Sequence, residues 1–302
     1  MYLGIDFLVA PDLRPCVMEV NLGLPGGAQE HDLTCLVRTG RSSGVFRTIE
    51  EISRDVYGKS FREYLYSLPW LESLKPLKLW LDGQGPFPRT FHPALRLEDK
   101  WVQYQILNSL VPMPETRLFD AAARTEAERF LARKGRLVGK RRLGRGGRDF
   151  RLIDHPEDLR AEIPRNYGQL LQEWVDSRVG SYVFSIRSVV FSGRHVCLYA
   201  NLASRAYSNH GILAYVDSGD RLKLSEEEFA TRSFHQRSWE ADIWFGQGEP
   251  AYLHHNLYED EVATAALVLP AGVLASIKEI SIRIERFYES LDLATLPPAF
   301  FE

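Results

Sequence analysis

The chain is predicted to fold as an α+β protein, because strand patterns and helix patterns both occur along its 302 residues. Two pairs of apolar strands, 3–9 with 15–20 and 182–191 with 195–201, are each joined by a turn and predict antiparallel hairpins. Apolar side chains at helical spacing follow Asp99 and recur near the C-terminal end, where they predict helices. Together these patterns indicate helices packed on antiparallel sheets.

The amino-acid composition and net charge limit the classes of protein to which this chain can belong. A content of 45% hydrophobic and 25% charged residues is ordinary for a globular protein of one large or two ordinary domains. The net charge of −3 gives no general attraction to nucleic acid or to an anionic membrane. The three cysteines are far apart and lack metal-ligand spacing, which fits a reducing compartment. Without a signal-like segment or a membrane-spanning apolar run, we expect a cytoplasmic protein, and a homodimer stays open.

The first hairpin gathers oxygen ligands. Asp6 lies on its first strand, while Glu19 and Asn21 lie two residues apart on the second, so these two face the same side. A Pro-Asp turn folds the second strand back on the first. Carboxylate and amide oxygens suit Mg²⁺, a hard cation that substrate phosphates usually complete. An ordinary hairpin with solvated acidic side chains is the alternative.

Between this hairpin and Asp99, the spacing of apolar residues predicts secondary structure less clearly. Glycines within 23–27 predict a loop. A helix is predicted at Thr48–Tyr66, with Thr48 as its N-cap and acidic residues in its first turn. Prolines and glycines between 69 and 93 predict an irregular stretch, of which 84–96 connects to the next unit.

From Asp99 onward, helices and strands alternate around a glycine-rich loop. The predicted elements are a helix after Asp99, a strand at Glu115–Phe119, a helix at Ala122–Lys134, a strand ending at Lys140 and a strand at Asp149–Ile153. The loop before the last strand contains Gly144, Gly146 and Gly147. Glycine lets backbone N–H groups close on a polyphosphate, and Lys140 adds a mobile positive charge beside them.

This loop is also strongly basic, which leaves other interpretations open. Its cations are Lys140, Arg141, Arg142, Arg145, Arg148 and Arg151. A plain hairpin turn and an RNA-binding patch are both compatible with such a cluster. Because five arginines exceed what a nucleotide needs, an anionic second substrate is a further interpretation. The Walker spacing of glycine, lysine and serine or threonine does not occur here.

The hairpin and the glycine-loop segment resemble the ATP-grasp superfamily, which includes D-alanine–D-alanine ligases and glutathione-synthetase-like enzymes. In that family an acidic residue is followed on the next strand by Glu-x-Asn, as Asp6 is followed here by Glu19 and Asn21. The family's hairpin lies near the end of the catalytic domain and follows a helix. Here the hairpin comes first, and the matching helix, predicted at Tyr258–Leu291 with a kink at Pro270, comes last. The resemblance therefore implies a circularly permuted ATP-grasp fold, in which two α+β subdomains clamp ATP.

The resemblance also implies nucleotide ligands. Two lysines match positions that touch the phosphates, the glycines match the phosphate loop, and the strand 170–175 matches the linker along the adenine edge, where backbone groups of Glu173 and Val175 would bond the purine. The implied set is Lys100, Lys140, Gly144, Gly146, Gly147, Gln172, Glu173, Trp174 and Val175.

The remaining implied roles concern the reaction. Lys140, Arg187 and Arg205 would be the catalytic cations, and Arg205 would share the acid substrate with Asn209, Gly26 and Gly27. Two Mg²⁺ ions would be held by the hairpin ligands. ATP would activate a carboxylate as an acylphosphate for attack by an amine or a similar nucleophile. An ATP-grasp small-molecule kinase is the alternative enzyme, and a nucleotide-binding or RNA-binding module without turnover is the alternative outside enzymes.

The implied domain organisation divides the chain into four parts. They are the metal hairpin at 1–27, a connecting segment or reduced substrate region at 28–97, the glycine-loop subdomain at 98–175, and the rest of the second subdomain at 176–302 with an insertion at 219–257.

Overall fold

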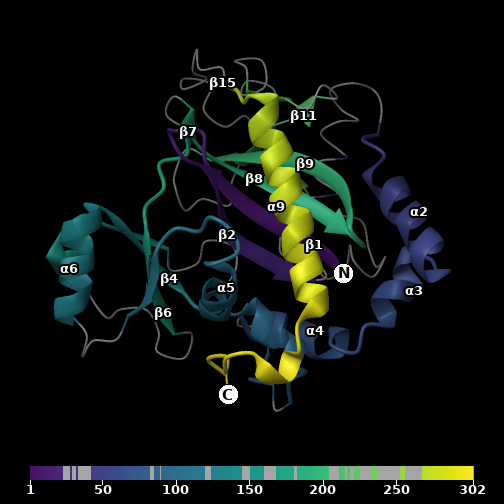
Figure 1. The fold of residues 1–302 in the computed structure, drawn as a ribbon, viewed down its shortest axis with the longest axis horizontal. Helices are drawn as coiled ribbons and strands as arrows, with labels where there is room; N and C mark the ends of the chain where they lie inside the picture. Colours follow the sequence, from purple (N-terminus) through teal and green to yellow (C-terminus); the bar gives the residue numbers. More distant parts are fainter. Residues whose placement is uncertain are drawn as a thin grey trace. The chain divides into compact units, whose positions relative to one another are not determined.

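The chain forms two compact units, each with its own antiparallel sheet and helices (Figure 1). The first unit contains Met1–Pro15, Asn21–Tyr64 and Asp176–Glu289, and the second contains Cys16–Val20, Leu65–Val175 and Ser290–Glu302. The α+β fold class is confirmed, whereas the predicted domain boundaries stay predictions. The computed structural model describes residues 1–22, 28, 32, 42–81, 85–88, 90–119, 124–144, 150–159, 168–179, 182–203, 211–214, 216–217, 221–224, 233–236, 252–255 and 267–301.

The large sheet of the first unit is built around the two predicted hairpins, and both are confirmed. Its strand order is β14-β13-β10-β9-β8-β1-β2, with β7 beside β8. The register of β1 and β8 places Asp6 directly opposite Arg187. A small sheet has the order β11-β12-β15. The strands are β1 (Tyr2–Val9), β2 (Pro15–Leu22), β7 (Arg178–Val179), β8 (Tyr182–Phe191), β9 (Arg194–Ala203), β10 (Gly211–Ala214), β11 (Val216–Asp217), β12 (Arg221–Leu224), β13 (Ser233–Gln236), β14 (Tyr252–His255) and β15 (Leu267–Val268).

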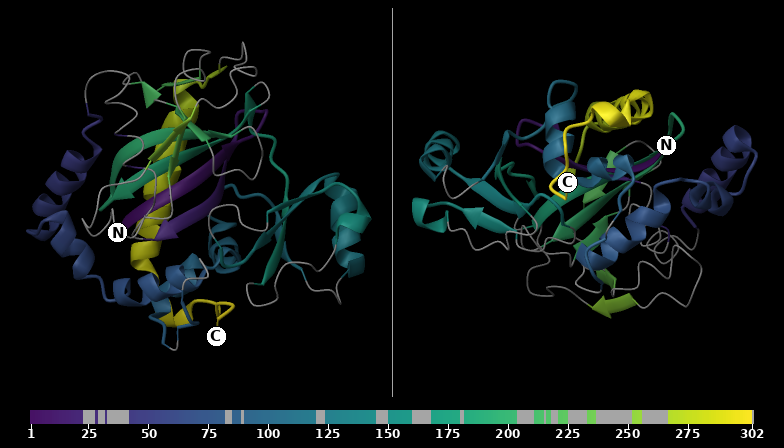
Figure 2. Two further views of the ribbon diagram at one scale, coloured as in Figure 1. Left: turned by 180° about the vertical axis from the view of Figure 1, so that it is seen from behind. Right: turned by 90° about the horizontal axis from the view of Figure 1, so that it is seen from below.

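Helix α9 (Ala271–Ser290) covers one face of this sheet, as the front and rear views show (Figures 1 and 2). Its apolar stripe is buried, and the buried Glu285 lies in line with it. One Glu285 oxygen accepts from the Met1 amino group at 2.8 Å, and the other accepts from the Gly193 N–H at 2.6 Å. The C-terminal part of α9 therefore meets both the start of β1 and the turn between β8 and β9.

The ionisation of Glu285 is expected to make the free energy of unfolding depend on pH. Burial raises the pKa of its carboxyl above the ordinary 4.5, against the opposing effect of the Met1 amino group. Because the folded-state pKa is the higher one, the stabilisation is complete below the ordinary pKa and is lost as pH rises through the raised value. Glu285→Gln cannot ionise, so its stability relative to wild type should improve over the pH range that begins at the ordinary pKa of 4.5 and extends through the raised value. Urea denaturation across that range measures it, and a pH-independent difference would contradict the assignment.

The helix predicted at 48–66 is two helices, and Thr48 is not its N-cap. Helix α2 (Val45–Tyr57) begins after Gly44, so Thr48 lies inside it. Gly58, at a φ of 65°, ends α2 in the left-handed region. Helix α3 (Phe61–Tyr66) then starts from a reciprocal cap, in which Ser60 N–H donates to Glu63 at 2.8 Å and Glu63 N–H donates to the Ser60 hydroxyl at 3.3 Å.

The helix predicted at 258–291 is shorter than expected. Within the described residues, 267–268 form β15 and the helix begins only at Ala271. Pro270 therefore precedes the helix rather than kinking it, and its carbonyl accepts the first-turn N–H of Val273 at 2.9 Å. This placement follows from proline, whose missing N–H costs a helix nothing at the start.

The second unit holds a four-stranded sheet of order β3-β6-β4-β5. Helix α6 (Arg124–Lys134) covers one face, where Phe130 packs with Leu137 and Leu171. Because neighbouring residues on a strand point to opposite faces, Lys140 and Gln172 lie on the face away from α6. The other elements are β3 (Thr116–Leu118), β4 (Leu137–Arg141), β5 (Arg151–Ile153), β6 (Gln169–Glu173), α4 (Leu71–Leu81), α5 (Lys100–Leu107), η1 (Pro93–Glu98), η3 (Pro156–Asp158) and η5 (Leu293–Thr295).

Helix α4 corrects the expectation of an irregular stretch between 69 and 93. It contains Pro76, which costs a helix interior about 3 kcal/mol. Four leucines on one side of α4 are buried, and each contributes roughly 2 kcal/mol by leaving water. Their sum exceeds the proline cost, so packing decides the conformation. These leucines are Leu71, Leu74, Leu77 and Leu81.

Candidate functional site

Lys100 joins three separate segments of the second unit. Its ammonium nitrogen lies 3.1 Å from a carboxylate oxygen of Glu19 and donates to the Gly144 carbonyl at 2.5 Å. The Lys100 side chain is only 9% exposed, whereas that of Glu19 is 24% exposed. The ammonium nitrogen of Lys100 therefore contacts both Glu19 of the first hairpin and Gly144 at the start of the glycine loop. The family resemblance implied a metal-ligand role for Glu19 and phosphate-binding roles for Lys100 and Gly144, but it could not predict their contact.

A buried ion pair holds the backbone around Lys100. Asp99 is fully buried and caps α5 by accepting the Trp101 N–H at 2.9 Å. The Arg142 guanidinium donates to the same carboxylate at 2.7 and 3.0 Å, and its backbone carbonyl accepts the Lys100 N–H at 3.1 Å. The Phe300 N–H also donates to Asp99 at 2.8 Å. Lys100 is thus fixed to the segment that leads into the glycine loop.

Sequence reasoning missed this pair. Asp99 before an apolar helical pattern is an N-cap signal that was present in the sequence. Nothing in the sequence indicates that Arg142, one of six clustered cations, would be the residue that pairs with it. The described members of that cluster are not a solvated patch, because Lys140 is buried and the Arg142 side chain is only 12% exposed.

Gly168 is packed tightly against this pair, which gives a testable effect on stability. Its φ is 61°, and a Cβ there would lie 2.8 Å from Cδ of Arg142 and 2.9 Å from the Phe300 ring. We expect Gly168→Ala to lower the free energy of unfolding by about 2–3 kcal/mol. Gly135→Ala is the matched control, since Gly135 has a φ of 77° but open space around it. Only backbone strain of about 1 kcal/mol should appear there. Equal losses in urea denaturation would show that the packing contributes nothing.

In the first unit, Asp6 and Arg187 form a cross-strand ion pair. Arg187 donates to the two carboxylate oxygens of Asp6 at 2.7 and 2.6 Å. The Asn21 amide donates to Asp6 at 3.2 Å. Two of the predicted metal ligands are therefore together, and the predicted catalytic arginine is bound to one of them. Asp6 keeps 15% and Arg187 keeps 21% of its side-chain surface exposed.

The oxygen set fits a hard cation in its chemistry. Asp6 and Glu19 each already pair with a positive group, at 2.6 and 3.1 Å, so a metal ion would compete with Arg187 and Lys100 for these oxygens. Asn21 follows Glu19 by two residues on β2, which puts both on one face of that strand. Among the described residues, no cluster of three or more His, Cys, Asp or Glu side chains is placed to hold a metal.

The predicted purine linker is partly engaged in the sheet. The Glu173 N–H donates to the Glu115 carbonyl at 2.8 Å, and the Trp174 N–H donates to the Arg136 carbonyl at 3.3 Å. The Gln172 amide donates to the Thr116 hydroxyl at 2.8 Å. Within the described chain, no hydrogen bond involves the backbone of Val175, which makes it the linker position most open to a ligand.

The side chain of Glu173 belongs to a charged cluster at the end of β6. It accepts from Lys134 at 2.9 Å, and Lys134 also lies 3.3 Å from Glu115. Burial lowers the pKa of Lys134, but its hydrogen bonds to Glu173 and Glu115 outweigh that effect and raise the pKa above its ordinary value. The cluster anchors the linker and carries no feature of a reaction site.

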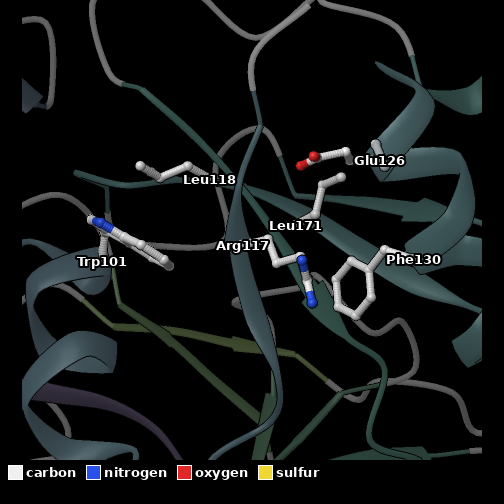
Figure 3. Close-up of a pocket in the computed structure, with 7 residues that line it drawn as sticks. Trp101, Arg117, Leu118, Glu126, Phe130 and Leu171 are labelled. Carbon is white, nitrogen blue, oxygen red and sulfur yellow. The ribbon is translucent and has the colours of Figure 1, made fainter. Parts of the chain in front are cut away.

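A cavity of about 220 Å³ lies beside β3 in the second unit (Figure 3). Its walls include Trp101, Arg117, Leu118, Glu126, Phe130 and Leu171. Figure 3 shows the Arg117 side chain directed toward the Phe130 ring. The Cζ atom of Arg117 lies 5.3 Å from the centroid of that ring. Phe130 and Leu171 belong to the core under α6. The cavity is therefore separate from the sheet face that carries Lys140 and Gln172.

Several predicted site residues lie outside the described residues. They are Gly26, Gly27, Gly146, Gly147, Arg205 and Asn209, together with the side chains of the predicted insertion at 219–257.

Comparison with known proteins finds a similarity for part of the chain. Residues 97–222 match the family model of an ATP-grasp domain. This range includes Lys100, Lys140 and Arg187, and the match supports the predicted resemblance to the ATP-grasp superfamily for that stretch. No curated protein matches the chain. No helix in the described part of the chain combines the length and apolar character that a membrane crossing requires.

Proposed function

We propose, starting from the ATP-grasp domain at residues 97–222, that the protein is an ATP- and Mg²⁺-dependent ligase that joins a carboxylic acid to an amine or a similar nucleophile. The observation that carries this proposal is the meeting of Glu19, Lys100 and Gly144 at one ammonium group. Glu19 lies outside the matched residues, yet it contacts Lys100 inside them, and the same ammonium donates to Gly144. A hairpin with an unrelated structural role would have no reason to place its acidic residue there.

The residue assignments follow the chemistry of each group. Lys100 and Lys140 bind phosphates as point charges, and the loop that begins at Gly144 wraps them with backbone N–H groups. Oxygens of Asp6, Glu19 and Asn21 would hold Mg²⁺, which would offset the phosphate charge. The open backbone of Val175 supports a role at the purine edge. Arg205, Asn209, Gly26 and Gly27 remain our assignment for the acid substrate.

The proposed reaction has two steps. A carboxylate oxygen of the acid attacks the γ-phosphorus, the bond from phosphorus to the β-γ bridging oxygen breaks, and ADP leaves. The nucleophile then attacks the acyl carbon, the bond from carbon to the phosphate oxygen breaks, and inorganic phosphate and a proton are released. Lys140 and Arg187 would offset the charge that spreads over the transferred phosphoryl group.

The order of the elements supports a circular permutation. Strand β1 pairs with β8 over residues Tyr2 to Phe7, although almost the whole length of the unit separates them in sequence. The C-terminal part of α9 meets the start of β1 through Glu285 and Met1. In an unpermuted order, such a helix would lead directly into this hairpin.

We also retain the prediction of a cytoplasmic protein.

Product analysis tests the function. Purified protein is incubated with ATP, Mg²⁺ and pools of candidate acids and amines, and ADP, phosphate and organic products are quantified. Inorganic phosphate equal to ADP, with a new amide, is expected. A phosphorylated organic product without free phosphate would instead establish a kinase.

Lys140→Ala should lower ATP affinity by about tenfold or more, since it removes a charge-assisted phosphate contact. Unchanged affinity in that variant would remove Lys140 from the site.

A further inference from the structure

One ammonium group holds both a proposed metal ligand and the start of the proposed phosphate loop. Lys100 contacts Glu19 at 3.1 Å and the Gly144 carbonyl at 2.5 Å, with little exposure to solvent. A phosphate that binds this ammonium competes with Glu19 for its positive charge. A metal ion that binds Glu19 competes with the ammonium for the same carboxylate.

We propose that Lys100 is a placeholder for the metal ion, and that this makes metal binding and nucleotide binding depend on each other. Without ligands, its positive charge neutralises Glu19. When the metal and nucleotide arrive together, the ammonium turns to a phosphate oxygen and Glu19 turns to the metal. This inference rests on the proposed ATP site and adds a coupling that the family match does not supply.

The electrostatics give the sign of the coupling. Metal alone leaves the ammonium of Lys100, which is 9% exposed, beside a new cation and without its carboxylate. Nucleotide alone draws the ammonium away and leaves Glu19 uncompensated next to phosphate charge. Each ligand removes the penalty that the other meets, so the two bind cooperatively and the coupling is reciprocal.

The first test measures Mn²⁺ binding to the whole protein without nucleotide, by electron paramagnetic resonance. Lys100→Met should raise Mn²⁺ affinity about fivefold or more, because the competing cation is gone. In the same variant, the gain in Mn²⁺ affinity that ATP produces should shrink. The matched control is Arg124→Met, since Arg124 is also ion-paired with one glutamate, Glu128, and neither residue has a proposed role in binding metal or nucleotide. Unchanged Mn²⁺ affinity in Lys100→Met would overturn the inference.

The second test uses the unaltered lysine, which guards against misfolding of the first variant. In EDTA, Glu19→Gln should bind ATP more tightly than wild type, because Lys100 is released. Removing a negative charge also favours ATP in general, so the substitution is repeated in the Lys100→Met background. The placeholder model requires the gain to disappear there, and an equal gain in both backgrounds would overturn it.

The two levels of the proposal fail separately. If wild type binds no ATP even with Mn²⁺, both the proposed function and the coupling are wrong. If Mn²⁺ and ATP bind together but the variants leave their coupling unchanged, only the placeholder role of Lys100 is wrong.

Discussion

Replacing Asp99 by alanine should lower the free energy of unfolding by about 3–5 kcal/mol, the cost of removing one partner of a buried ion pair. The Asp99 carboxylate is fully buried and receives the Arg142 guanidinium, the Trp101 N–H and the Phe300 N–H. Alanine leaves the positive charge of Arg142, whose side chain is 12% exposed, without a partner. It also removes the cap of α5 and orphans a backbone N–H.

A second capping aspartate provides the matched control. Asp292 accepts the Ala294 N–H at 3.0 Å at the start of η5 but is exposed. Asp292→Ala should therefore cost only about 1 kcal/mol. Urea denaturation followed by circular dichroism measures both variants. A loss for Asp99→Ala no greater than that for Asp292→Ala would mean that the ion pair is unimportant.

The same variant separates stability from site geometry. Since the Arg142 carbonyl accepts the Lys100 N–H, loosening Arg142 should disturb the lysine that the proposed function assigns to phosphate. Asp99→Asn keeps an oxygen for the Trp101 N–H but loses the charge. If this variant remains folded, its ATP affinity should fall. A variant that is folded and binds ATP as wild type does would leave Asp99 with a purely structural role.

The elements that could be predicted from the sequence are those whose stabilising interactions lie between residues close together in the chain. Hairpins and helix periodicity depend on neighbours in sequence, so β1 with β2 and β8 with β9 were predictable. Helix α4 was not, because the burial of its leucines outweighs Pro76 only once the tertiary core exists. The split between α2 and α3 depends on the left-handed Gly58, whose turn the apolar pattern does not reveal.

The candidate site shows the same division. Asp6, Glu19 and Asn21 could be selected because their residue types and spacing follow strand alternation. The contact partners could not, since Lys100 is 81 positions from Glu19 in sequence and the structure alone brings them to 3.1 Å. Arg187 illustrates a further gap. Its position on a strand was predicted, whereas its ion pair with Asp6 depends on the register of β1 and β8.

Replacing Glu19 by glutamine should reduce ATP-dependent turnover by about a hundredfold or more, since it removes a charged oxygen ligand from the proposed metal site. Glutamine keeps the shape of the side chain and one oxygen, so the change isolates the charge. Because Glu19 is 24% exposed and its described ion pair is with Lys100, the fold should survive. ADP formation at a Mg²⁺ concentration that just saturates the wild type measures the effect, and the acid and amine found by product analysis serve as substrates.

Asp12→Asn is the matched control for Glu19→Gln, because it removes one negative charge from the turn of the same hairpin. Asp12 is 64% exposed and, among the described residues, its ion pair is with the exposed Arg14, so surface screening makes its charge nearly neutral in effect. Turnover by Asp12→Asn should equal that of wild type. If Glu19→Gln also keeps full activity while remaining folded, the hairpin is structural and the metal assignment fails. Restoration of its activity by a large excess of Mn²⁺ would instead show that the loss lies in metal affinity, which is the step at which a ligand substitution acts.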